Sequence, residues 1–209
     1  MLVFWKQKLV MLALPKTGTT ALEAALLPLA DAAILNPPGL KHVSAQRYRN
    51  LLAGFFEQRG SRPMETMAVM RDPAGWLESW YRYRTRPQLD GKDTSTAGIS
   101  FDDFVDAWLR ADQPEFARVG SQANFLTNDA GQIAVDHIFR HDMMDAAVTF
   151  LEARLNTRIT LERRNTSPVR DVALSPAMAA RLRAERPDEF EIWERLRGDG
   201  SHASKDRGI

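Results

Sequence analysis

The sequence predicts an α/β protein in which a parallel sheet is flanked by helices. Three observations support this fold class. The segment Lys8–Pro15 is apolar without alternation, which is typical of a strand buried on both faces of a parallel sheet. Similar short segments recur along the chain, with helical segments between them. The 209 residues contain no linker rich in Gly, Ser or Pro, so we expect one domain.

Each element has a local signal. Lys8–Pro15 begins a series of expected strands, and the others are 31–38, 64–71, 131–142 and 157–168. The expected helices alternate with them and span Thr19 to Pro28, 45–58, 73–84, 100–112, 143–155 and 175–196, the last with a break near Pro187. Ser44, Asp72 and Ser100 precede three of these helices as N-caps. Residues 1–197 should therefore form the domain, and 198–209 a flexible tail.

The composition restricts the classes of function. The formal net charge is +1, so no global field favours nucleic acid or an anionic membrane. There are no cysteines, which rules out disulfides and thiolate metal sites. The chain has no run of about 18 apolar residues and lacks the pattern of a signal peptide. We expect a cytoplasmic protein without a membrane span.

The first motif is the loop between the first expected strand and helix. A helix N-terminus offers unpaired N–H groups and partial positive charge, and a tight loop before it can curl around a phosphate. Here Lys16 adds a cation and Gly18 permits close backbone approach. The remaining loop residues are Pro15 and the hydroxyl-bearing Thr17, Thr19 and Thr20. The lysine precedes the glycine, unlike in the GxxxxGK[ST] loop, so this is a phosphate loop of a different type.

The second motif is "RDPAGWLESWY". Arg71 ends an apolar strand, and ligands of open α/β sheets bind at the carboxyl ends of strands. Ser79 follows about two turns into the next helix. A forked guanidinium and a hydroxyl can hold one anion from two sides.

Together, "LPKTGTTAL" and "RDPAGWLESWY" resemble the sulfotransferases that use 3′-phosphoadenosine 5′-phosphosulfate (PAPS), in particular bacterial and glycan-type members. The segment 136–168 is similar more loosely. The resemblance implies a P-loop-like α/β fold, with residues 15–20 around the 5′-phosphosulfate and with Arg71 and Ser79 at the 3′-phosphate. It implies transfer of a sulfuryl group to an acceptor hydroxyl, on a carbohydrate or another small molecule, with 3′-phosphoadenosine 5′-phosphate (PAP) as product and with no metal.

Two residues are expected to act in catalysis. Lys16 would stabilise the charge that develops on the leaving phosphate. Of the four histidines, His42 follows the second expected strand and precedes a capped helix. The resemblance implies a catalytic histidine or carboxylate at this place in glycan-type members, so we interpret His42 as the general base. His137 and His141 are expected to be structural. In the loop 163–170, Arg164 and Asn165 are candidates for closing over the nucleotide, and a solvated basic turn is an equal alternative.

Two other functions stay open. A P-loop nucleotide kinase or NTPase would use Asp72 for magnesium, although the lysine stands in the wrong place for it. A non-catalytic relative would bind only a nucleotide or a partner protein. The sequence indicates neither the acceptor nor the oligomeric state.

Overall fold

A computed structural model describes residues 1–57, 63–161 and 172–196, together with the backbone of 201–203. The chain divides into two compact units. The first contains Met1–Arg71, Gln122–Arg164 and Arg195–Ile209, and the second contains Asp72–Ser121 and Asn165–Glu194. In the described ranges, no helix has both the length and the apolar character that a membrane crossing requires.

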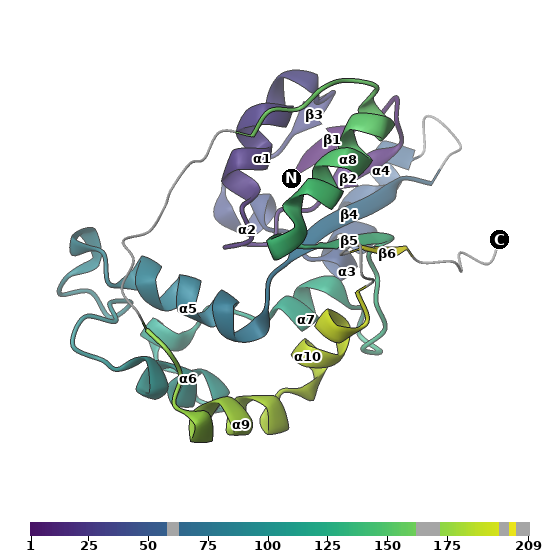
Figure 1. The fold of residues 1–209 in the computed structure, drawn as a ribbon. Helices are drawn as coiled ribbons and strands as arrows, with labels where there is room; N and C mark the ends of the chain where they lie inside the picture. Colours follow the sequence, from purple (N-terminus) through teal and green to yellow (C-terminus); the bar gives the residue numbers. More distant parts are fainter. Residues whose placement is uncertain (58–62, 162–171, 197–200, 204–209) are drawn as a thin grey trace. The chain divides into compact units, whose positions relative to one another are not determined.

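The first unit is built on a mixed, six-stranded sheet with the strand order β3-β1-β2-β4-β5-β6 (Figure 1). The strands are β1 (Leu2–Phe4), β2 (Leu9–Met11), β3 (Ala32–Ala33), β4 (Glu65–Met70), β5 (His137–Arg140) and β6 (Ser201–Ala203). Neighbouring strands β2, β4 and β5 are parallel, whereas β1, β3 and β6 pair antiparallel with their neighbours. The α/β class is confirmed, but the expectation of a parallel sheet holds only for the three central strands.

The antiparallel part begins with a hairpin that the sequence did not predict. Strand β1 turns back into β2 through Trp5–Lys8, where the N–H of Lys8 donates to the carbonyl of Trp5 over 3.1 Å. Lys8 has a positive φ of 53°, a conformation that hairpin turns usually assign to Gly or Asn. Because the turn lacks these residues, its sequence carries no hairpin signal.

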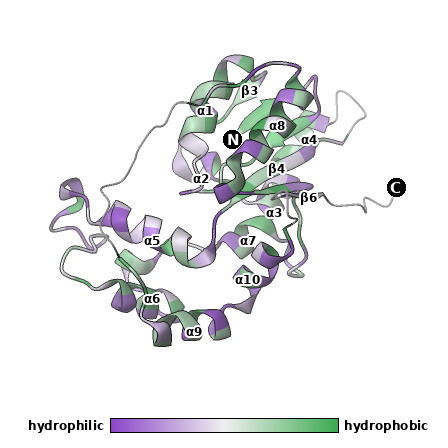
Figure 2. Cartoon of the chain, viewed as in Figure 1, coloured by the Kyte–Doolittle hydropathy of each residue, from purple (hydrophilic) through white to green (hydrophobic). Residues whose placement is uncertain are grey.

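The described residues of the first unit form six α-helices: α1 (Thr19–Leu26), α2 (Pro38–Lys41), α3 (Ala45–Tyr48), α4 (Gly54–Glu57), α7 (Gln122–Leu126) and α8 (Met144–Leu155). Helices α1 and α8 pack on one face of the sheet, through Leu22 and Leu26 of α1 and Ala147 and Leu151 of α8. The strands contribute alternate residues to this core, as the pleat requires: Leu2, Phe4, Leu9, Met11, Met67, Val69 and Phe139. Figure 2 shows the strands as the apolar centre of this unit.

Four expectations meet a different outcome in this unit. Of the strand expected at 31–38, only Ala32–Ala33 form β3, and α2 begins at Pro38. The helix expected over 45–58 is capped by Ser44, which accepts the N–H of Arg47, but its middle, Arg49–Ala53, is a π-helical segment. Of the strand expected at 157–168, the described part 157–161 forms no strand. Within the expected tail, Ser201–Ala203 form β6 against β5. A domain boundary at residue 197 stays a prediction.

The second unit is helical within its described residues. Its helices are α5 (Pro73–Arg84), α6 (Phe101–Leu109), α9 (Pro176–Glu185) and α10 (Pro187–Glu194). The predicted caps are confirmed, since Asp72 accepts the N–H of Gly75 and Ser100 that of Asp103. The predicted break at Pro187 separates α9 from α10. The core contains Trp76 and Trp108, whose rings meet edge to face with centroids 6.4 Å apart.

Candidate anion site at the carboxyl edge of the parallel strands

The three parallel strands bring polar residues to one edge of the sheet. Because β2, β4 and β5 run in the same direction, the segments that follow them leave from the same edge. The residue after β4 is Arg71, and the residue after β5 is His141. The last residues of these strands, Met70 and Arg140, are register partners, so Arg71 and His141 follow side by side.

The loop after β2 has the backbone of an anion-binding turn. Lys16 and Gly18 have positive φ values of 67° and 78°, whereas Thr17 between them does not. Alternation between left-handed and other conformations turns successive N–H groups toward a common concavity. A left-handed conformation in a non-glycine residue costs about 1–2 kcal/mol, so Lys16 is held there against its intrinsic preference. Strain of this kind is concentrated at functional sites.

The threonines of the loop have different environments. Thr17 is fully buried, and its hydroxyl donates to the carbonyl of Leu14 over 2.8 Å, which closes the turn. Thr19 is 5% exposed, and Thr20 is exposed. Helix α1 begins at Thr19 with Gly18 as N-cap, and no side-chain hydrogen bond caps it among the described residues. The first turn of α1 therefore presents its N–H groups and positive dipole end to the loop.

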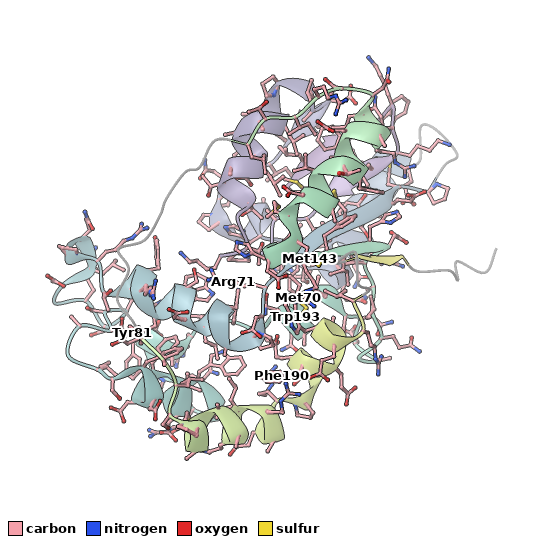
Figure 3. The ribbon with its side chains drawn as sticks, in the orientation of Figure 1. Met70, Arg71, Tyr81, Met143, Phe190 and Trp193 are labelled. Carbon is pink, nitrogen blue, oxygen red and sulfur yellow. The ribbon has the colours of Figure 1, made fainter. Side chains whose placement is uncertain are left out.

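The main chain of Arg71 is fixed by a residue that sequence reasoning missed. Gln122, which is fully buried at the start of α7, accepts the N–H of Arg71 over 3.0 Å and donates to its carbonyl over 2.9 Å. The side-chain amide thus takes the place of a neighbouring strand just where β4 ends. Figure 3 shows Arg71 at this point, directly after Met70. Nothing in the sequence around Gln122 signals this contact, because it joins residues far apart in the chain.

His141 also lies at this edge, and the expectation of a purely structural role did not anticipate this. A Cβ placed on Gly18 would lie 3.6 Å from Cδ2 and 3.7 Å from Nε2 of His141, so the imidazole lies against the loop. Burial and the positive charge of Arg71 lower the pKa of His141, and Asp142 opposes them. The strand-end rule that indicates Arg71 applies equally to "DHIFRHD" and would have identified His141.

His42 is held in one tautomer. Its Nδ1 lies 2.6 Å from the carbonyl oxygen of Ala13, just before the loop. A carbonyl only accepts hydrogen bonds, so Nδ1 carries the proton and Nε2 of the neutral ring is an acceptor. Burial is the largest influence on the pKa of His42 and lowers it. The neighbouring Lys41 donates to Glu23 of α1 over 2.7 Å.

The other predicted residues lie elsewhere. His137 begins β5, at the opposite edge, where its Nε2 is 2.8 Å from Glu65. Ser79 is half-buried on α5 in the second unit, so its pairing with Arg71 stays a prediction. Arg164 and Asn165, with most of the loop 163–170, lie outside the described residues. In the described part of the chain, no three His, Cys, Asp or Glu residues gather as a potential metal site.

Comparison of the chain with family models, with curated proteins and with solved structures found no match. The site therefore has to be interpreted from its own chemistry. It combines a strained cationic loop, an uncapped helix start, an arginine and two histidines in one unit. These groups suit a ligand with phosphate or sulfate groups.

Proposed function

We propose that the protein is a sulfotransferase that moves a sulfuryl group from PAPS to an acceptor hydroxyl, on a carbohydrate or another small molecule. The observation that carries the proposal is the anion loop at residues 15–20, at the same sheet edge as Arg71. The first motif of the resemblance and Arg71, the first residue of the second motif, belong to this edge. The P-loop-like character of the fold belongs to this proposal.

In the reaction, the bond between sulfur and the bridging phosphate oxygen breaks while a bond forms between sulfur and the acceptor oxygen. The leaving oxygen gains negative charge. Lys16 and the N–H groups of the loop and first helical turn would stabilise that charge, as preorganised donors do in phosphoryl transfer. The protein mainly aligns the two reactants for in-line attack.

The proton of the acceptor hydroxyl has to leave during the attack. His42 suits this role because Ala13 binds the proton on Nδ1, which leaves Nε2 as the basic nitrogen. The lowered pKa keeps the ring neutral near pH 7, ready to accept a proton. Lys41 and Glu23 beside it form an ion pair that holds α2 to α1.

Titration calorimetry with PAP in EDTA, with ATP in parallel, tests the proposal. We expect PAP to bind without metal and to bind more weakly to the Arg71→Ala variant. Assays with labelled PAPS and a panel of acceptors then test for transfer. Binding of ATP only when Mg²⁺ is present, with none of PAP, would favour the nucleotide kinase instead.

A non-catalytic relative would bind PAP but transfer nothing to any acceptor. The contact of Asp72 with the N–H of Gly75 is that of an N-cap, which gives no support to a magnesium role. The acceptor assays therefore decide between enzyme and binding protein.

A further inference from the structure

His141 occupies a position that the proposed mechanism does not use. It is the first residue after β5, and its ring lies against Gly18, where the loop has no side chain. An added Cβ at Gly18 would also come within 3.1 Å of the Met144 side chain. The loop, the end of β5 and the start of α8 therefore meet closely around the imidazole, which is half-buried.

Positive charge predominates around His141. The end of β4 contributes Arg71, whose positive charge acts on His141. Lys16 belongs to the loop whose Gly18 lies against the imidazole. The segment of His141 itself contributes Asp142, but Arg140 binds this carboxylate through two nitrogens, at 3.0 and 2.6 Å. The first turn of α8 contributes Asp145, which is exposed to solvent. A second cation here is unfavourable until an anion arrives.

We propose that His141 is an additional ligand-binding residue of this anion site, which takes up a proton when a phosphate-bearing ligand binds and so makes binding tighter at lower pH. The inference rests on the proposed function, since it names a further contact of the same nucleotide. The proton comes from solvent to the free imidazole nitrogen, and the imidazolium then donates a charge-assisted hydrogen bond to a ligand oxygen.

The direction of the pH effect follows from linkage. Burial first and Arg71 second lower the pKa of His141 in the free protein, so the ring is neutral at pH 7. A bound phosphate favours the imidazolium and raises that pKa. The extra affinity is therefore complete below the pKa of the free protein and is lost as the pH rises through the pKa of the complex.

The test is calorimetry of PAP binding in two buffers of different ionisation enthalpy, neither of them phosphate. Wild-type protein is compared with His141→Gln and with the matched control His137→Gln, since His137 begins the strand β5 that His141 follows and lies at the opposite edge of the sheet. We expect the wild type and the His137→Gln control to take up protons when PAP binds. The His141→Gln variant should take up fewer protons, because glutamine cannot be protonated. The dissociation constant of His141→Gln should rise about tenfold at pH 6 and less at pH 8.

A second measurement protects the test against a folding defect in the variant. Nuclear magnetic resonance of wild-type protein with labelled histidine should show the pKa of His141 rising when PAP is added. An unchanged pKa, or equal proton uptake by wild type and His141→Gln, would overturn the role of His141 and leave the sulfotransferase proposal standing. Absence of PAP binding to wild-type protein would overturn both.

Discussion

At the scale of single residues, Lys16 combines a strained backbone with the positive charge that the proposed mechanism uses. Its φ is 67°. Alanine is as strained as lysine in this conformation, whereas glycine adopts it without a steric cost. The two substitutions Lys16→Ala and Lys16→Gly therefore remove the same charge but treat the strain differently. This makes it possible to separate catalysis from folding at one position.

We expect both Lys16 variants to lose transfer, by about 10²–10³-fold or more, the effect of removing one preorganised donor. The free energy of unfolding should stay within about 1 kcal/mol of wild type, because the lost strain in Lys16→Gly is offset by a more flexible unfolded chain. Turnover assays and urea unfolding measure the two effects. Normal transfer by either variant would remove Lys16 from the mechanism.

His42 leads to a prediction about pH. As the proposed general base, His42 has to be neutral, and burial lowers its pKa below the usual 6.5. We therefore expect kcat/KM to be constant near pH 7 and to fall as the pH drops through that lowered pKa. The His42→Ala variant should lose about 10²–10⁴-fold in turnover while PAP binding is unchanged. An unaltered rate in His42→Ala would assign the base to another group.

At the scale of elements, the contact between α7 and the end of β4 depends on Gln122. Truncation to Ala would remove the two part-buried hydrogen bonds that Gln122 makes to the N–H and the carbonyl of Arg71. We expect Gln122→Ala to lower the free energy of unfolding by about 1–3 kcal/mol and to weaken PAP binding.

The matched control for Gln122→Ala is Gln46→Ala. Gln46 makes an exposed contact with Asn50, so its truncation should change the free energy of unfolding by less than about 0.5 kcal/mol. Calorimetry with PAP and urea unfolding of both variants give the comparison. Equal effects at the two positions would show that the hydrogen bonds between Gln122 and the main chain of Arg71 add no measurable stability or affinity for PAP.

The elements also show which parts of the fold a sequence reveals. The caps Ser44, Asp72 and Ser100 and the break at Pro187 are local, and all were predictable because a few neighbouring residues determine them. Strand β1 was not, because its turn places Lys8 in a conformation for which the sequence gives no signal. The direction of β3 and β6 depends on pairing with distant strands, which local patterns do not encode.

The candidate site divides in the same way. The loop and Arg71 could be recognised from residue types beside an apolar strand. Gln122 acts through a contact across 51 residues and could not. The position of His141 at the end of a strand could be predicted from the sequence. Its contact with Gly18 could not, because this contact depends on β2 and β5 pairing on opposite sides of β4.

At the scale of the whole molecule, the two half-buried histidines His42 and His141 link the free energy of unfolding to pH. Both His42 and His141 have a pKa in the folded protein below the ordinary 6.5 of an unfolded chain. The unfolded state therefore binds more protons below about pH 6.5, and their contribution to stability is present above that value and lost as the pH falls. We expect the unfolding temperature to decrease from pH 7 to pH 5.

The double variant His42→Gln/His141→Gln should flatten this decrease. Scanning calorimetry at half-unit steps of pH measures it. A decrease of the same size in wild type and double variant would show that carboxylates, rather than these two imidazoles, govern the range. PAP added to the wild type should reduce the decrease if His141 takes up its proton in the complex.

The pair of hydrogen bonds between Gln122 and Arg71 has a consequence for which parts of the sequence can change in length. The chain leaves the first unit after Arg71 and returns to it at Gln122, and the two residues are bound to each other. The intervening segment 72–121 therefore forms a long insertion between two residues of the first unit that are hydrogen-bonded to each other. Changing the length of such an insertion alters the closure entropy only slowly. Because this segment shares its core with α9 and α10, it cannot be exchanged alone, but insertions into its loops should leave the loop 15–20, Arg71 and His141 in place.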